Sequence, residues 1–139
     1  MNTEEQHRAL EAVRSQCAAL AARASLHCEF HIARQDDGGA HVEFDGREYS
    51  YVVTERGSEL ERRRSSNPDD ILYWLIVDAA FAAAAQFELE HRVPGQDVRR
   101  LLFAKKLELL ARVRVDWSEK QRSAIEQVLA EHPFDDTLS

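Results

Sequence analysis

Residues 71–85, ILYWLIVDAAFAAAA, form the most apolar stretch of the chain and decide its fold. Asp78 is the only charged residue in this stretch. A membrane span needs about 20 apolar residues, whereas this run passes directly into the polar sequence QFELE at 86–90. Its residues are apolar on every side of a helix, a pattern typical of a central helix packed on several faces. We therefore expect a buried core helix and not a membrane segment.

The boundaries of this helix are marked by capping and breaking residues. Asn67 is a suitable N-cap, and Pro68 fits the first helical turn, so the helix begins here. The sequence VPG at 93–95 ends it after about Arg92. A buried unpaired charge is costly, so Asp78 is expected to have a basic or hydrogen-bonding partner inside the protein. A functional role for this acid is the alternative.

The N-terminal half of the chain changes its apolar period from helical to alternating. Thr3 is expected to cap a helix whose apolar stripe continues to Ala24. Alternation then predicts three strands over 26–32, 41–45 and 49–53, with turns at Asp37-Gly38-Gly39 and Asp45-Gly46. Residues 55–67 are expected to form a polar connection. The three strands are predicted to pair as an antiparallel meander with one face exposed to water.

Two more helices are predicted in the C-terminal part, from about Gln96 to Val113 and from Asp116 to the region before His132-Pro133. The predicted fold class is therefore α+β. It consists of an N-terminal helix, a three-stranded antiparallel meander and a three-helix bundle packed on one sheet face. A length of 139 residues suits a single domain over 1–139, large enough to bury a hydrophobic core.

The composition excludes some classes of function. A net charge of −7 argues against a dedicated nucleic-acid binder, and it favours basic partners. The single basic cluster, Arg62 to Arg64, is interpreted as part of a solvated loop. Cys17 and Cys28 lack the spacing of zinc ligands or of a redox motif, so they are expected to be buried reduced thiols. The charged N-terminus does not resemble a signal peptide, which favours a cytoplasmic location.

One candidate site consists of histidines and acids predicted on the water-facing side of the meander. Two alternating triplets and two acids of the adjacent turn make up the set: His27, Glu29, His31, His41, Glu43, Asp45, Asp36 and Asp37. A metal site is conceivable, although nothing in the pattern fixes tetrahedral geometry. An ordinary solvated face and an acidic binding surface for a basic protein are the other interpretations.

A second group of charged residues surrounds the predicted end of the central helix. Glu88-x-x-His91 matches half of a di-iron motif, but the chain has no second half, so we expect no metal. A structural polar network is the preferred interpretation, and it comprises Asp78, Glu88, His91, Arg92, Asp97, Arg99 and Arg100. No GxSxG, Walker or GxGxxG motif is present. We therefore expect neither catalysis nor a cofactor.

An ordered series of motifs runs from Tyr51 to Asp136. The motifs are TERG at 54–57, LYW at 72–74, FExxHR at 87–92, QDxRRLxF at 96–103, LELL at 107–110 and HPFDD at 132–136. This series resembles the Immunity protein 63 family of bacterial polymorphic toxin systems. The resemblance covers the C-terminal two-thirds of the chain and does not extend to residues 1–25.

The resemblance implies a small cytoplasmic protein that protects its producer, or a sister cell, from a secreted toxin in bacterial competition. Such a toxin inhibitor acts by protein–protein interaction, binding the cognate toxin domain and blocking its active site or substrate entry. The matching residues are expected to form a shared framework, because contact surfaces must differ between toxins to be specific. The alternatives are a metal-binding or metalloenzyme domain and a regulatory scaffold.

Overall fold

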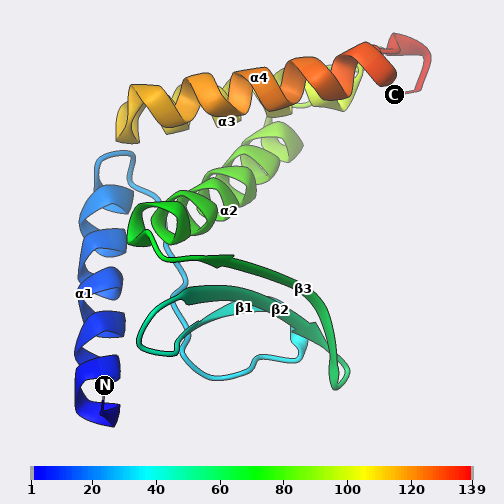
Figure 1. The fold of residues 1–139 in the computed structure, drawn as a ribbon. Helices are drawn as coiled ribbons and strands as arrows, with labels where there is room; N and C mark the ends of the chain where they lie inside the picture. Colours follow the sequence, from blue (N-terminus) through cyan, green and yellow to red (C-terminus); the bar gives the residue numbers. More distant parts are fainter. Residues whose placement is uncertain (1, 139) are drawn as a thin grey trace. The chain divides into compact units, whose positions relative to one another are not determined.

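The computed structural model describes residues 2–138 and has the predicted order of elements (Figure 1). The elements are α1 (Thr3–Ala22), β1 (Asp37–Phe44), β2 (Tyr49–Glu55), β3 (Ser58–Ser65), α2 (Pro68–Glu90), α3 (Val98–Val113), α4 (Val115–Glu131) and the short 3₁₀ helix η1 (Asp136–Leu138). The α+β fold class, with a helix, a three-stranded antiparallel sheet and three further helices, is confirmed.

The chain divides into two compact units. Unit 1 comprises Met1–Ala21 and His27–Ile76, and unit 2 comprises Ala22–Leu26 and Val77–Ser139. Helix α2 contributes its first part to unit 1 and its second part to unit 2. Because one helix runs through both units, we retain a single domain over residues 1–139 as our proposal.

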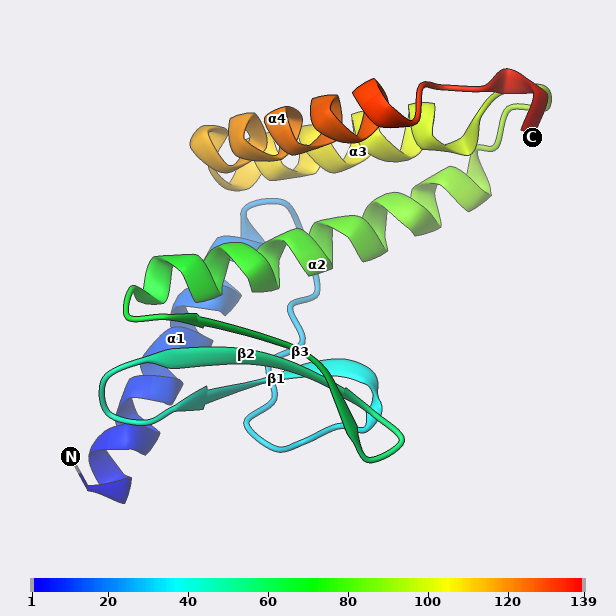
Figure 2. The same cartoon turned by 45° about the vertical axis from the view of Figure 1, so that its right-hand side comes forward.

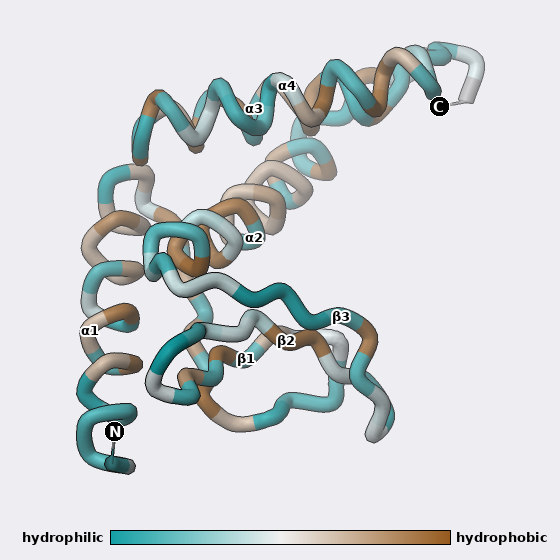
Figure 3. Tube along the Cα trace, in the orientation of Figure 1, coloured by the Kyte–Doolittle hydropathy of each residue, from teal (hydrophilic) through white to brown (hydrophobic). Residues whose placement is uncertain are grey.

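Helix α2 supplies much of the apolar core. Its first part has four side chains that are buried to at least 95%: Ile71, Leu72, Leu75 and Ile76. Among the described residues it is the one helix whose length and composition would allow it to cross a membrane, a test that core helices also pass. Figure 3 shows apolar residues gathered along this helix and in the middle of the sheet.

In unit 1, the sheet has the strand order β1-β2-β3 with both pairs antiparallel (Figure 2). The register aligns Val42 with Tyr51 and Tyr51 with Arg63, so these residues share one face. On this face the ring of Tyr51 lies 6.0 Å from that of Trp74 in an edge-on arrangement. The sheet therefore packs against the first part of α2 through an aromatic contact.

The positions of two strands differ from the prediction. Residues 26–32 do not form a strand and are irregular, with one backbone hydrogen bond to β1, from Val42 N to the carbonyl oxygen of His31 at 2.9 Å. The predicted polar connection contains strand β3. Arg56 and Gly57 both have positive φ, 50° and 82°, and form the tight turn that leads into β3. Asp37-Gly38-Gly39 begins β1 and is not the predicted turn.

The prediction of reduced cysteines is wrong, because Cys17 and Cys28 form a disulfide. The bond joins α1 to the irregular segment, and its Cα atoms are 6.7 Å apart. Cys17 is fully buried, as expected of an apolar stripe position. The sequence spacing of 11 residues carried no signal for the pairing, which depends on how the segment after α1 turns back beside the helix.

The predicted cap of the first helix and the predicted start of the last helix also differ. The side chain of Asn2, and not of Thr3, accepts the hydrogen bond from the backbone N–H of Glu5 at 2.9 Å. Helix α4 starts at Val115 directly after α3, so Asp116 lies inside its first turn. Arg114 alone separates the two helices of unit 2.

Helices α3 and α4 run side by side in unit 2 (Figures 1 and 2). Their buried side chains include Leu110, Val113, Trp117 and Ile125. The Ser118 hydroxyl donates to the carbonyl oxygen of Leu107 at 2.9 Å, which fixes the start of α4 against α3. The apolar helical period of the sequence therefore predicted this helical hairpin well.

Asp78 on α2 is exposed, so the prediction that its charge is buried is wrong. The Asp78 carboxylate interacts electrostatically with Lys106 of α3. Burial lowers the pKa of the Lys106 amine, and the nearby Asp78 opposes this shift. Lys106 Nζ also lies 5.6 Å from the ring centre of Phe81. Asp78 therefore belongs to a partly exposed contact between α2 and α3.

The exposure of Asp78 predicts a small effect of its replacement. We expect Asp78→Leu to change the free energy of unfolding by less than about 1 kcal/mol, since exposed ion pairs contribute little. Denaturant unfolding of the variant and of Asp78→Asn measures this change. A loss of several kcal/mol in either variant would show that Asp78 has a larger structural role than this contact provides.

Candidate functional site

The predicted histidine and acid set lies in unit 1, where the structure separates it into groups. The first group is in the irregular segment after α1. Glu29 accepts from His31 Nε2 at 3.1 Å and lies 3.8 Å from His27 Nε2. The side chains of His27 and Glu29 are 86% and 69% exposed, so both are available to a partner. Because His31 is hydrogen bonded to β1 through its backbone, this group lies beside the sheet edge.

The second group is a row of charges across the sheet, formed by His41, Glu43, Arg62 and Glu59 and called the charged row below. Glu43 Oε2 lies 2.7 Å from His41 Nε2, and Glu43 Oε1 accepts from Arg62 Nη1 at 2.9 Å. Arg62 Nη2 donates to Glu59 at 2.7 Å. The strand register places His41, Val52 and Arg62 in line, which explains why these residues meet.

The electrostatics of the charged row keep Glu43 ionised. The Arg62 hydrogen bond, supported by His41, holds the pKa of Glu43 below its usual range. His41 is 5% exposed, so the expectation that it faces water is wrong. Glu43 and Asp45 are the members of this triplet that remain accessible, and the side chain of Glu43 is 46% exposed.

The other three predicted acids hold turns in place. Asp36 accepts from Arg34 at 2.6 Å and from the backbone N–H of Gly57 at 3.3 Å, and the bond with Arg34 lowers its pKa. Asp37 and Asp45 each accept from backbone N–H groups a few residues further along the chain. These acids are exposed, yet their carboxylates already have a structural role.

The geometry of these groups does not match a metal site. Among residues 2–138, no group of three or more His, Cys, Asp or Glu side chains is arranged to hold a metal ion. His31 and His41 each hydrogen bond to the nearest glutamate of their own triplet. The alternation of the sequence therefore predicted the local pairs but not a convergent set of ligands.

Negative charge is concentrated in unit 1. This unit has fourteen Asp and Glu residues against eight Lys and Arg residues, whereas unit 2 has eleven against ten. Nearly all of the net charge of −7 therefore belongs to the unit that contains the sheet. The total charge follows from the composition, whereas its division between the two units depends on the fold. An acidic surface of this kind attracts basic partners and speeds their association.

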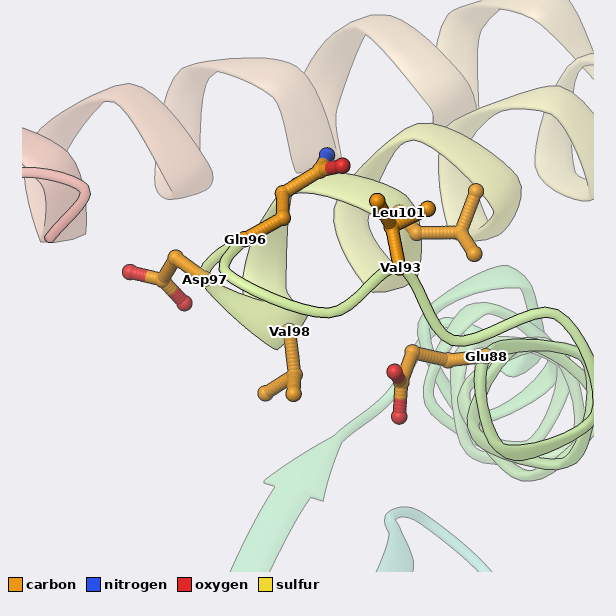
Figure 4. Close-up of a pocket in the computed structure, with 6 residues that line it drawn as sticks. All are labelled: Glu88, Val93, Gln96, Asp97, Val98 and Leu101. Atoms are coloured by element: carbon orange, nitrogen blue, oxygen red, sulfur yellow. The ribbon is translucent and has the colours of Figure 1, made fainter. Parts of the chain in front are cut away.

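The predicted polar network of the helical region consists of separate local contacts. Glu88, near the end of α2, pairs at 2.7 Å with Arg92, which lies two residues beyond the last residue of this helix. His91 Nδ1 lies 2.9 Å from the carbonyl oxygen of Phe87, on whose ring it stacks. Figure 4 shows Glu88 and Asp97 at different sides of a shallow depression lined also by Val93, Gln96, Val98 and Leu101. Among the described residues, no hydrogen bond or ion pair joins the Glu88–Arg92 pair to the Asp97–Arg99 pair.

Asp97 is the centre of a different cluster, which binds the C-terminal tail. It accepts from the backbone N–H of Arg99 at 2.9 Å and so caps α3. It also accepts from the Arg99 side chain at 2.8 Å and from the backbone N–H of Asp135 at 2.9 Å. These bonds hold the pKa of Asp97 far below its usual range. Arg99 in turn donates to the carbonyl oxygens of His132 and Pro133.

The tail is held by a second set of contacts beside the first. Arg100 pairs with Asp136 at 2.9 Å, and the backbone N–H of Asp97 donates to Asp136 at the same distance. The Arg100 guanidinium lies 4.4 Å from the ring centre of Phe134, which also contacts Phe103. We call the cluster of Asp97, Arg99, Arg100, Phe134, Asp135 and Asp136 the tail lock.

The tail lock explains two motifs of the sequence together. The motif at 96–103 supplies Asp97, Arg99 and Arg100, and the motif at 132–136 supplies the residues that they bind. Sequence analysis identified both motifs but did not pair them, because more than 30 residues separate the partners. These residues make contacts within unit 2 and form part of its framework.

Comparison with known proteins identifies the family. The family model of Immunity protein 63 matches residues 45–127, which is more than half of the chain. The match begins at the β1–β2 turn, continues through β2, β3, α2 and α3, and ends within α4. No curated protein and no solved structure matches the chain. The chain belongs to the Immunity protein 63 family.

Proposed function

We propose that this protein binds and neutralises one cognate secreted toxin domain without catalysing a reaction, and that unit 1 provides the contact surface. Membership of an immunity protein family supports a toxin as the protein partner. The concentration of negative charge in unit 1 is the single observation that selects this surface. The toxin surface that binds it is correspondingly basic.

The contact is proposed to involve the accessible members of the predicted set. Glu29 is 69% exposed and lies beside the sheet edge, whereas Glu43 is 46% exposed and lies between His41 and Arg62 in the charged row. His41 is too buried to be a direct contact, and it positions Glu43 instead. Bound to a basic cleft, these carboxylates would block the toxin's active site or the entry of its substrate.

Unit 2 is proposed to be the framework that holds the fold. Its charges nearly balance, and the tail lock uses its arginines and acids for internal contacts. This division fits the need for immunity surfaces to differ between toxins while their framework is shared. We also propose that the protein works in the cytoplasm, where it would meet a toxin that has entered the cell.

A charge reversal at Glu29 tests the proposed contact surface. We expect Glu29→Arg to weaken toxin binding by roughly ten-fold, mainly through slower association, because it places a positive charge on the acidic unit. Binding of the wild-type protein should also weaken as salt is added. Surface plasmon resonance with the immobilised toxin domain measures both effects.

The matched control for this experiment is Glu126→Arg, an equal change at an exposed position of α4 in unit 2. This control should bind the toxin like the wild-type protein. If Glu126→Arg weakens binding and Glu29→Arg does not, the contact surface lies in unit 2 and our assignment is wrong. Thermal melts of both variants show that they remain folded.

A further inference from the structure

Strand β3 is an open edge of the sheet. The described residues pair it with β2 alone, whereas β1 at the other edge donates a backbone hydrogen bond to the irregular segment. An edge strand of eight residues presents backbone N–H and C=O groups to which another strand can bind. Leu60, in the first half of β3, is 60% exposed. The register of β3 against β2 shifts between Glu59 and Glu61, so the regular part of this edge, residues 61–65, is the part that a partner strand can join.

Charged side chains commonly protect such edges, but two of those on β3 are directed toward their own sheet. Arg62 reaches across β2 to bind Glu43 on β1 at 2.9 Å. Arg63 pairs with Glu61 of its own strand and lies over the rings of Tyr51 on β2 and Trp74 on α2, 5.6 Å from each ring centre. Because both arginines are held over the sheet, they leave the backbone of the β3 edge uncovered.

The charges of β3 are also sorted by sign along the strand. Its first half contains Glu59 and Glu61, and its second half contains Arg62, Arg63 and Arg64. When two such strands pair in antiparallel orientation, the acidic half of each lies beside the basic half of the other. The strand is therefore complementary in charge to a second copy of itself.

We propose that this protein forms a two-fold homodimer through antiparallel pairing of β3 with β3 of a second copy. A pairing centred on Arg62 places Glu61 of each copy opposite Arg63 of the other. The two Arg62 side chains then meet at the axis, but each is neutralised by Glu43 and Glu59 of its own chain. The sheets of the two copies join into one continuous sheet.

This dimer is distinct from the proposed binding of the toxin. The interface that holds it together is small. A single pair of eight-residue strands buries less surface than a permanent dimer needs, so the association is weak and depends on protein concentration. We infer that a second copy, and not a strand of the toxin, pairs with the β3 edge. The reason is that the charge pattern of β3 is complementary to itself.

Mixing two charge-reversed variants of the full chain tests the proposal by analytical ultracentrifugation. Glu61→Arg alone and Arg63→Glu alone should each weaken self-association by roughly ten-fold, since two opposite-charge pairs become like-charge pairs. An equimolar mixture of the two variants should associate again. In the mixed dimer, one copy carries two basic side chains at these positions and the other carries two acidic ones.

Controls separate this pairing from a general effect of charge. Arg47→Glu and Glu48→Arg make the same changes in the exposed turn between β1 and β2, and neither variant nor their mixture should alter association. Circular dichroism confirms that each variant is folded. A wild-type protein that remains monomeric up to millimolar concentration, or a mixture that stays monomeric, overturns the proposal. Protection of β3 amides from hydrogen exchange only after toxin addition would overturn it in favour of a toxin strand.

Discussion

Asp97→Ala is expected to lower the melting temperature of the protein by roughly 10 °C, because it removes the N-cap of α3 and an acceptor of charged hydrogen bonds. Asp97 is 5% exposed and binds Arg99 and the backbone N–H of Asp135. Without its carboxylate, the guanidinium of Arg99 loses its counter-charge and the tail loses one of its anchors. Differential scanning calorimetry measures the change.

The control for this variant is Asp116→Ala. Asp116 also binds an arginine two residues away, Arg114 at 2.7 Å, but its side chain is 65% exposed. Exposed pairs of this kind contribute little to stability, so the melting temperature should change by no more than roughly 3 °C. If both variants melt at the wild-type temperature, the tail lock does not stabilise unit 2.

The tail lock also predicts how the stability of the folded protein falls at acid pH. The folded protein holds the pKa values of Asp97, Asp135 and Asp136 below their usual range, through Arg99, the Thr137 hydroxyl and Arg100 respectively. Aspartates of the unfolded chain titrate near pH 4, so this stabilisation is complete above about pH 4 and is lost as the pH falls further. The melting temperature of Asp97→Ala should therefore depend less steeply on pH in the acid range than that of the wild-type protein.

Reduction of the Cys17–Cys28 disulfide is expected to lower the free energy of unfolding by about 3 kcal/mol. The bond closes a short loop between α1 and the irregular segment, and so restricts the unfolded chain. Urea unfolding with and without dithiothreitol measures the effect. The variant Cys17→Ala with Cys28→Ala should unfold at one midpoint whether or not reductant is present.

Two free thiols in the native protein purified without reductant would contradict this account of the cysteines.

The oxidation state of Cys17 and Cys28 inside the cell also reports the compartment of the protein, since the cytosol keeps most thiols reduced. Alkylation inside intact cells should therefore modify both cysteines if our proposed cytoplasmic location is correct. A pair that resists alkylation there places the protein in an oxidising compartment.

The sequence predicted the helices well, because their apolar period and end residues act over short distances. Helix α2 begins at Pro68, as its Asn-Pro start indicated, and ends at Glu90, close to the expected end. Strand β3 was missed because an exposed edge strand needs no apolar alternation, and its sequence SELERRRS has none. The Arg56-Gly57 turn that precedes it was the available signal.

The candidate site was harder to predict, since it depends on contacts between distant residues. Alternation correctly placed His41 and Glu43 on one face, but the burial of His41 and its link to Arg62 depend on the pairing of three strands. The disulfide and the tail lock likewise join segments that only the folded chain brings together. Short motifs identified these residues without revealing their partners.

Co-expression with the C-terminal domain of the protein that the neighbouring gene encodes, as the candidate toxin, tests the central claim most directly. We predict that the wild-type chain restores growth of cells that produce the toxin, and that the two proteins purify as a stable complex. The family assignment and the acidic character of unit 1 both support this outcome. A folded chain that neither rescues growth nor binds the folded toxin would contradict the account.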